Sequence, residues 1–388
     1  PVSPVSPVSP AAPPGAAFDI ARLRSALDLR SAVVENGRLV QRLVDGSVVE
    51  FSIDVEAQGA IQRLFDKYDV PVGAAVAIEV ATGRVVLFAS RARVPTERDP
   101  CVDASPPAAS IFKIVTAAAL LEDADIRADE RVCYRGVSAV KQIRLGDLDE
   151  ARLEIDTGTA CATLARGMAD SLNPVLGRLA DAKLSPRTLL RRAERFVFGR
   201  AMPFDLPLDV SPVEIPQDRL EFARTAAGFW HVGLSPVHGA AIAQAIANGG
   251  RMLRPTLVDR VVGPNGADLY RAAPALLRTV VRPETAAALA AMMLGTVDVG
   301  TARKDFVDPE GRPFLTVPVA GKTGSLANPR PYAGYSWFVG FAPAAPAGSA
   351  VGDGEPVYAV AVLLINEERW RIKAALVARE ALRALLAE

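Results

Sequence analysis

The hydrophobic pattern predicts β-strands near both ends of the chain. Residues 72–92 hold two runs rich in β-branched and small apolar residues, joined by a turn at Thr82-Gly83, as in a hairpin. Three more such runs follow one another between residues 317 and 366. We expect one sheet that is assembled from these two distant parts of the chain.

Between the two groups of strands the pattern changes to that of helices. Apolar residues recur three and four positions apart, which places them on one helix face. We expect helices over 110–123, 162–180, 186–198, 235–250 and 284–297, and a last one over 370–388. Such helices would cover the faces of the sheet, and the middle ones would pack as a mainly α subdomain beside a cleft.

The N-terminal part of the chain has a different character. Pro-Val-Ser triplets predict an extended spacer over residues 1–16, although an ordinary disordered terminus has the same composition. Residues 17–73 are predicted to form a small separate region with a helix, a hairpin around Asp45-Gly46 and a second, amphipathic helix. The chain starts without Met and has no apolar run of about 18 residues, so we expect a piece of a longer protein whose membrane anchor lies upstream.

Charge and residue counts narrow the chemistry. The 388 residues carry 44 basic and 44 acidic side chains, a balance that gives no reason to expect nucleic acid as a partner. The two histidines, His231 and His238, share one segment, which disfavours a Ser-His-Asp triad. The three cysteines show no CxxC spacing, so we expect no metal site, and we expect no cofactor. Only seven lysines occur, so each lysine within a motif is informative.

Ser110 and Lys113 form the first of three short motifs, an S-x-x-K. The apolar spacing that follows predicts a helix starting at or near Ser110, and residues three apart lie on one helix face. The Lys113 amine can then reach the Ser110 hydroxyl, and a desolvated lysine with a lowered pKa can activate a serine nucleophile. The alternative is an N-cap serine with a solvated lysine one turn later.

Lys322, Thr323 and Gly324 form a rarer motif, a K-T-G that is followed by Ser325. The same stretch resembles the end of a phosphate-binding loop, but that loop needs a glycine where this chain has Thr316. The nucleotide-binding interpretation therefore fails.

A K-T-G on a strand beside a cleft would have clear uses. Lys322 would supply positive charge, the Thr323 hydroxyl could bind a substrate carboxylate, and Gly324 would let a substrate backbone approach closely. The backbone N–H groups of Ser325 and Ser110 could form an oxyanion hole.

Ser171 and Asn173 form an S-x-N between the other two motifs. Taken alone, this is most simply a polar break in a helical segment before Pro174. Placed between the others, Ser171 could relay a proton between Lys113 and a leaving group, and Asn173 could hold Lys113 or a substrate amide.

These three motifs in this order resemble the signatures of the penicillin-binding protein and serine β-lactamase superfamily. The motif spacing and the segments GLSPVHGAAIAQAIANGG and YSWFVGFAP are similar to those of a transpeptidase domain. The resemblance covers residues 74–388, and residues 17–73 resemble the small pedestal-type region that often precedes such a domain. It implies an α+β fold with an antiparallel five-stranded sheet, flanking helices and an inserted mainly α subdomain.

The resemblance also implies a function. The implied protein is a serine D,D-transpeptidase that acts on the D-Ala-D-Ala stem peptides of peptidoglycan through an acyl-enzyme. β-Lactams acylate the same serine in such enzymes. Such enzymes act outside the cytoplasm, in the periplasm or at the outer face of the inner membrane. The implied catalytic residues are Ser110, Lys113, Ser171 and Lys322, and the implied substrate-binding residues are Asn173, Thr323, Gly324 and Ser325.

Other members of the superfamily stay open as alternatives. The β-lactamases with an S-x-N motif deacylate with a Glu in an E-x-x-L-N element, and this chain has Ala169 at that place. A slow-deacylating penicillin-binding protein is therefore favoured over a β-lactamase. A D,D-carboxypeptidase, a β-lactam sensor without turnover and a degenerate scaffold remain, and the sequence names no protein partner in wall synthesis.

The cysteines fit an oxidising compartment loosely. Cys133 and Cys161 could form a disulfide in the helical subdomain, or they could remain two buried thiols. Cys101 would stay unpaired in either case.

Overall fold

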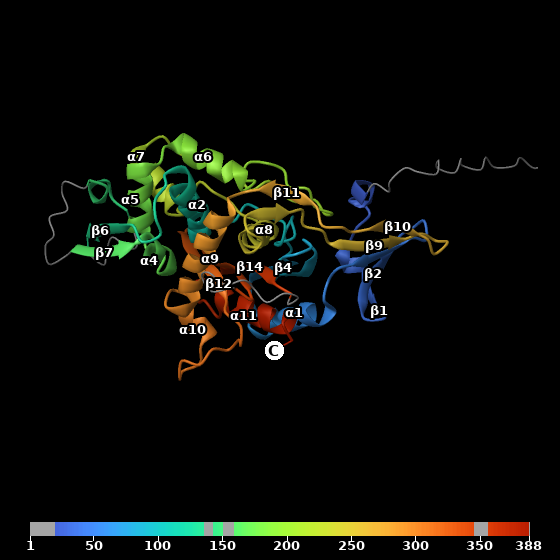
Figure 1. Ribbon diagram of the computed structural model, residues 1–388. Coiled ribbons are helices and arrows are strands. Elements are labelled where there is room, and N and C mark those ends of the chain that lie inside the picture. The colour runs from blue at the N-terminus through green and yellow to red at the C-terminus, as the bar shows by residue number, and fades with distance from the viewer. Residues whose placement is uncertain (1–19, 136–142, 150–158, 345–355, 388) are drawn as a thin grey trace, which may run out of the picture.

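The computed structural model describes residues 20–135, 143–149, 159–344 and 356–387. At its centre lies an antiparallel sheet of five strands in the order β12-β13-β14-β4-β5 (Figure 1). Their bounds are Val72–Glu79 for β4, Val85–Ala92 for β5, Ala320–Pro329 for β12, Tyr332–Ala342 for β13 and Tyr358–Asn366 for β14. The predicted sheet is confirmed, with the early strand β4 paired to the late strand β14.

Helices cover both faces of this sheet because its middle strands are apolar on both sides. Helix α8 packs against one face, and α1 and α11 pack against the other (Figure 1). These helices span Pro236–Ala247, Val55–Lys67 and Ala374–Leu385. Gly239 of α8 faces Val339 and Ala361 so closely that even a Cβ there would lie within 3.3 Å of both side chains.

A helical subdomain is inserted between the strands and lies on the left in Figure 1. Helix α9 runs between this subdomain and the edge strand β12. The elements of the subdomain are η3 (Ala109–Phe112), α2 (Lys113–Asp123), β6 (Arg131–Arg135), η4 (Leu145–Asp147), β7 (Thr159–Thr163), α4 (Leu164–Ala169), α5 (Asn173–Lys183), α6 (Pro186–Arg195) and α7 (Arg219–Ala226). The helices beside it are α9 (Pro283–Asp298) and the short α10 (Arg303–Phe306). The helix expected over 162–180 is broken, because Ser171 adopts a left-handed backbone conformation between α4 and α5.

The middle of the chain contains more strands than the sequence indicated. Four lie between α8 and α9: β8 (Arg251–Leu253), β9 (Val258–Val262), β10 (Asp268–Arg271) and β11 (Leu276–Thr279). A second five-stranded sheet, in the order β1-β2-β3-β9-β10, joins two of them to β1 (Val33–Glu35), β2 (Arg38–Arg42) and β3 (Val48–Phe51). The hairpin predicted at Asp45-Gly46 is confirmed, and its sheet is completed by a hairpin from far along the chain.

The start of the chain is less helical than expected. The described part of residues 18–33 holds only two short 3-10 turns, η1 (Ile20–Leu23) and η2 (Leu29–Ser31). The predicted spacer over residues 1–16 lies outside the described residues. The division of the chain near residue 73 remains a prediction, and the second sheet contains strands from both sides of that point.

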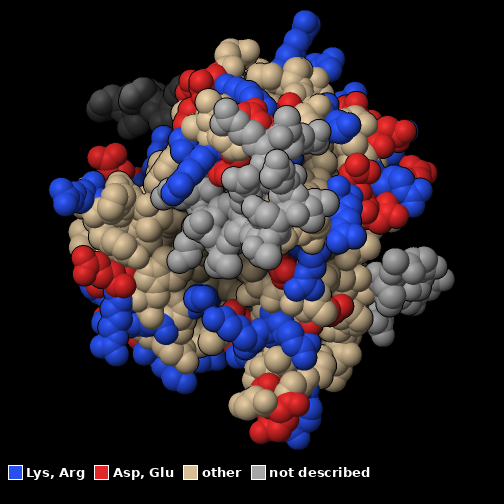
Figure 2. All heavy atoms as spheres, turned by 90° about the vertical axis from the view of Figure 1, so that its left-hand side faces the viewer, with Lys and Arg blue, Asp and Glu red and all other residues tan. Residues whose placement is uncertain are grey.

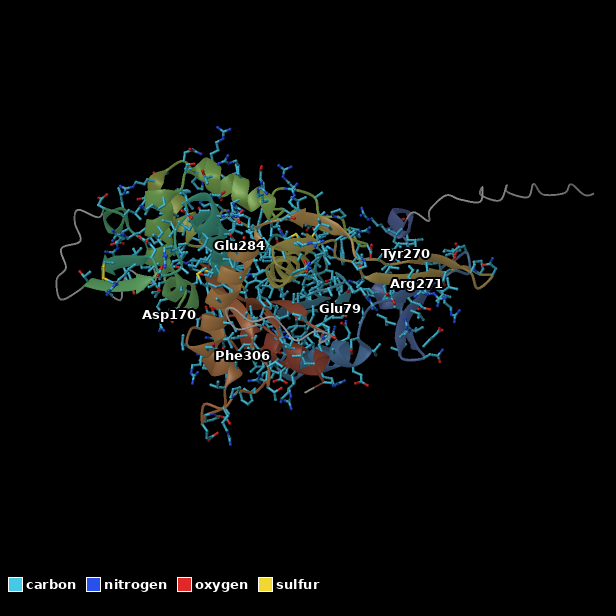
Figure 3. All side chains as sticks on the ribbon, in the orientation of Figure 1. Glu79, Asp170, Tyr270, Arg271, Glu284 and Phe306 are labelled. Carbon is cyan, nitrogen blue, oxygen red and sulfur yellow. A yellow bond between two sulfur atoms is a disulfide. The ribbon has the colours of Figure 1, made fainter. Side chains whose placement is uncertain are left out.

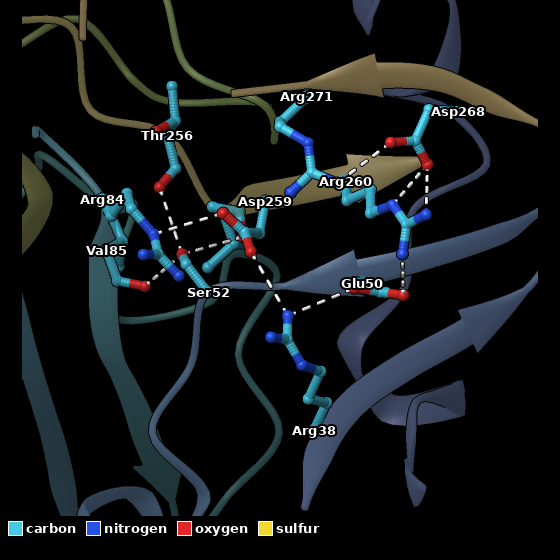
Figure 4. Close-up of polar contacts among 11 residues, drawn as sticks. Arg38, Glu50, Ser52, Arg84, Val85, Thr256, Asp259, Arg260, Asp268 and Arg271 are labelled. Atoms are coloured by element: carbon cyan, nitrogen blue, oxygen red, sulfur yellow. Dashed lines mark hydrogen bonds and ion pairs between the residues drawn. The ribbon is translucent and has the colours of Figure 1, made fainter. Parts of the chain in front are cut away.

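Buried polar contacts fix the second sheet against the main one (Figure 4). The Ser52 hydroxyl is 2.7 Å from the carbonyl oxygen of Val85 at the start of β5, and 3.1 Å from that of Leu257. An ion pair joins Arg84, in the β4–β5 turn, to Asp259 of β9. The Ser52 hydroxyl is shielded from water, so its hydrogen bonds stabilise this junction, whereas the more exposed ion pairs of β2, β3 and β9 lie within the second sheet itself.

The face of the molecule that Figure 2 shows is mixed in charge. Acidic and basic side chains alternate over the face in Figure 2, in keeping with the zero formal net charge. Among the described helices, none has the length and apolar character needed to cross a bilayer.

Candidate active site

Ser110 lies in the η3 turn directly before α2, at the edge of the inserted subdomain. The preceding residue, Ala109, has a φ of 49°, a left-handed conformation that costs energy for a residue with a side chain. Gly228 packs against this turn so tightly that a Cβ there would clash with the Ala109 carbonyl. The turn therefore holds the Ser110 hydroxyl at the wall of a cavity of about 550 Å³.

Lys113 begins α2 and is completely buried. Its amine nitrogen is 2.6 Å from the Ser110 hydroxyl oxygen, 2.6 Å from the side-chain oxygen of Asn173 and 3.3 Å from the Ser171 hydroxyl oxygen. The alternative of a solvated lysine one turn after a capping serine is therefore wrong.

Ser171 stands between two lysines. Its left-handed backbone, with a φ of 56°, turns the hydroxyl between α4 and α5 toward the cavity. The Lys322 amine donates to this hydroxyl at 2.9 Å and to the carbonyl oxygen of Thr323 at 2.9 Å. The structure thus joins Ser110, Lys113, Ser171 and Lys322 in one chain of polar contacts.

Both lysines are held in an environment that disfavours their charge. Burial lowers the pKa of Lys113 well below its ordinary 10.5, and the nearby charge of Lys322 lowers that pKa further. Burial lowers the pKa of Lys322 to about 7. Burial therefore favours the uncharged form of the Lys113 amine, whose lone pair can accept the proton of the Ser110 hydroxyl.

The other residues of the K-T-G motif lie on β12, the edge strand of the main sheet. Thr323 and Ser325 line the same cavity as Ser110. A Cβ on Gly324 would sit 3.1 Å from Trp337 and 3.3 Å from Ile111, so the glycine lets β12 come close to η3. The structure brings together all eight residues that the three motifs and Ser325 supplied.

Thr301 is a cavity residue that the sequence did not reveal. It follows α9, and its hydroxyl oxygen is 2.6 Å from the hydroxyl oxygen of Thr323. Gly228 and Phe229 form another part of the wall. None of these residues belongs to a short motif. They reach the cavity through the packing of segments that are distant in the sequence, so no local pattern indicated them.

The histidines do not form a catalytic triad. The ring nitrogens of His238 lie 2.8 Å from the Ser211 hydroxyl and 2.6 Å from the carbonyl oxygen of Phe196, and burial lowers its pKa to about 4. His231 is paired with Glu221. Among the described residues that line the cavity there is no histidine. Across residues 20–135, 143–149, 159–344 and 356–387, no three potential metal ligands are grouped together.

A disulfide closes the outer end of the inserted subdomain. Cys133 of β6 and Cys161 of β7 occupy paired positions of a two-stranded antiparallel sheet and are bonded to each other (Figure 3). Cys101 is a buried free thiol.

This chain is similar to known proteins over most of its length. Residues 73–385 match the family model of the penicillin-binding protein transpeptidase domain. The peptidoglycan D,D-transpeptidase PbpA of Mycobacterium tuberculosis is 29% identical over 280 residues, which are 67% of this chain and 50% of the relative. Stage V sporulation protein D of Bacillus subtilis is 26% identical over 326 residues, which are 77% of this chain and 48% of the relative. The chain thus spans about half the length of the curated relatives it matches.

Solved structures show the same fold. The crystal structure of PBPA from Mycobacterium tuberculosis aligns with a TM-score of 0.71 and 25% identity, covering 88% of this chain and 83% of that one. An imipenem acyl-enzyme complex of that protein aligns with a TM-score of 0.70 and 25% identity, covering 88% and 80%. The D,D-transpeptidase domain from Eggerthella lenta shares the fold, with a TM-score of 0.73, 24% identity and coverage of 93% and 91%. This chain belongs to the penicillin-binding protein transpeptidase family.

Proposed function

We propose that this chain is the catalytic part of a serine D,D-transpeptidase that cross-links peptidoglycan stem peptides. The observation that carries the proposal is the position of the Lys113 amine, which lies 2.6 Å from the hydroxyl oxygen of Ser110. This amine is buried, and burial lowers its pKa. A serine hydroxyl becomes a useful nucleophile only when a base takes its proton, and this amine is in position to do so.

The first half of the reaction acylates Ser110. Its oxygen attacks the carbonyl carbon between two D-alanines while its proton passes to Lys113. The backbone N–H groups of Ser110 and Ser325 stabilise the resulting oxyanion. When the C–N bond breaks, the proton passes from Lys113 through the Ser171 hydroxyl to the departing D-Ala nitrogen, and an ester on Ser110 remains.

The second half reverses the proton flow. An amine of another stem peptide attacks the ester, loses a proton to the same relay and forms the new amide, and Ser110 regains its proton. β-Lactams acylate the same serine. Their adduct persists because Ala169, at the place of the deacylating Glu of β-lactamases, is a buried methyl group packed near Gly295.

The edge strand binds the donor peptide. An extended peptide can pair with β12 as a further strand beside the cavity that Thr323 and Ser325 line. Thr323 and Ser325 bind the terminal carboxylate, and Lys322 supplies positive charge behind them. Asn173 holds Lys113 in place, as its 2.6 Å contact with the amine supports.

We place this activity outside the cytoplasm. The Cys133–Cys161 disulfide supports an oxidising compartment, and the family works on the cell wall. Residues 74–388 would form the catalytic domain, residues 17–73 a pedestal-type region, and a segment upstream of this chain the membrane anchor. The substrates are stem peptides and the inhibitors are β-lactams.

Intact-mass spectrometry of the protein with benzylpenicillin tests the proposal. We expect one adduct of the full drug mass that persists for hours, and release of D-Ala from a pentapeptide donor in the presence of an acceptor amine. An adduct without any D-Ala release would indicate a sensor, and rapid drug consumption without an adduct would indicate a β-lactamase. No adduct at all would contradict the proposed function.

The pH dependence of acylation should follow the two lysines. The rate constant with benzylpenicillin should rise with pH as Lys113 loses its proton, because the base must be uncharged. It should fall as pH increases beyond about 7, because Lys322 then loses the charge that attracts the drug's carboxylate. Mass-spectrometric rates between pH 5 and 10 would show the falling limb in the wild type and its absence in Lys322→Arg. A falling limb that survives this substitution would mean that another group controls it.

A further inference from the structure

The hydroxyls of Thr301 and Thr323 form a pair in the wall of the cavity that Ser110 and Ser171 also line. Their oxygens are 2.6 Å apart, and both side chains line the cavity. Each hydroxyl has one proton, so one of the two must donate to the other.

The backbone of the inserted subdomain holds Thr301 in place. Its N–H donates to the carbonyl oxygen of Ala169 at 3.1 Å, and its hydroxyl is 3.4 Å from the same oxygen. Gly300 packs against this carbonyl so closely that a Cβ would clash with it. The end of α4, directly before the S-x-N motif, therefore sets the position of the Thr301 hydroxyl against the K-T-G strand.

The direction of the hydrogen bond decides what Thr323 can bind. If Thr301 donates to Thr323, the proton of Thr323 is free to point outward to a substrate carboxylate. If Thr323 donates to Thr301, its outward side presents lone pairs, which repel a carboxylate. The carbonyl of Ala169 competes only weakly for the Thr301 proton at 3.4 Å, so a bound carboxylate can draw both hydroxyls into one donating chain.

Two lysines stand in the wall of the same cavity. Lys304 of α10 and Lys373, directly before α11, line it together with Asp305. Two lysines beside one carboxylate leave an excess of positive charge, which attracts anions.

We propose that Thr301 is a positioning residue for carboxylate recognition, which orients the Thr323 hydroxyl so that it donates to the free carboxylate of the donor substrate. The inference rests on the proposed function and names a residue that the three motifs do not contain. Thr301 does not act on the scissile bond, so its loss should affect only donors that carry the carboxylate.

Benzylpenicillin and its methyl ester provide the test, because they differ only in that carboxylate. Rate constants for adduct formation are measured by intact mass for the wild type, Thr301→Val, Thr301→Ser and the exposed-site control Thr279→Val. We expect Thr301→Val to lower the rate constant for benzylpenicillin about tenfold, because one charge-assisted hydrogen bond to the carboxylate is lost. The rate constant for the methyl ester should stay within about twofold of the wild-type value. Thr301→Ser and Thr279→Val should react like the wild type with both compounds.

Other outcomes would overturn the inference. If Thr301→Val lowered the rate constants for both compounds equally, Thr301 would only support the fold. If it left the rate constant for benzylpenicillin unchanged, the Thr323 hydroxyl would not depend on Thr301 for its orientation. Thr301→Ala, which has less bulk, and the thermal unfolding midpoint of each variant separate a lost hydroxyl from a disturbed turn. A wild type that forms no adduct with either compound would instead overturn the proposed function, and this inference with it.

Discussion

Ser110→Ala is expected to abolish the benzylpenicillin adduct and the release of D-Ala, with both rates falling at least about ten-thousandfold. The reason is geometric, because Ser110 is the hydroxyl that touches the Lys113 amine at 2.6 Å and also lies in the strained turn beside β12. Ser171 is a second hydroxyl near that amine, but it accepts from Lys322 and its position between α4 and α5 suits a relay. Intact-mass spectrometry over several hours measures the adduct.

The control is Ser105→Ala, since Ser105 is an exposed serine five positions earlier in the chain. This variant should form the adduct at the wild-type rate. If Ser110→Ala still gained the drug's mass, peptide mapping would identify another nucleophile, and the assignment of Ser110 would be wrong.

Lys113→Met is expected to slow acylation at least about a thousandfold and, at the same time, to stabilise the fold by roughly 1–2 kcal/mol. Activity falls because Ser110 loses its base. Stability rises because methionine fills the buried site without the cost of burying an amine beside Lys322. Benzylpenicillin acylation rates and urea unfolding measure the two effects separately.

The pH dependence of stability gives a second readout. The pKa of Lys113 is lowered in the folded state, so the unfolded chain binds more protons between that pKa and about 10.5. Wild-type stability should therefore rise with pH over this window, and the rise should be smaller in Lys113→Met. Lys183→Met, at an exposed lysine of α5, should change neither acylation nor this slope. Wild-type acylation rates in Lys113→Met would contradict the role of Lys113 as the base.

The main sheet could be predicted from the sequence because its strands carry strong local signals. The runs that became β4, β5 and β14 are rich in Val and Ala, the run that became β13 is rich in aromatic residues, and turn residues lie near their ends. The hairpin of β9 and β10 had a signal too, the Pro-Asn-Gly turn at residues 264–266, but its strands are short and stand between two strongly helical segments. Its pairing with β3 depends on tertiary structure, which no local pattern reports.

The residues of the active site that belong to the three motifs could be predicted from the sequence. The motifs identified Ser110, Lys113 and Lys322 by residue type and order, but not the distances or the burial that lower the pKa values of the two lysines. The left-handed conformations at Ala109 and Ser171 could not be predicted, because neither position is a glycine. Thr301 meets Thr323 only because α9 ends against α4, so its role depends on the packing of three separate segments.

The pairing of β4 with β14 has a consequence for biosynthesis. A ribosome completes the β4–β5 hairpin early, but the neighbour of β4 emerges only near the C-terminal end of the chain. Until then the apolar edge of β4 has no native partner and is open to pairing with other chains. Shielding this edge until residues 358–366 have been made would therefore protect the growing chain from aggregation.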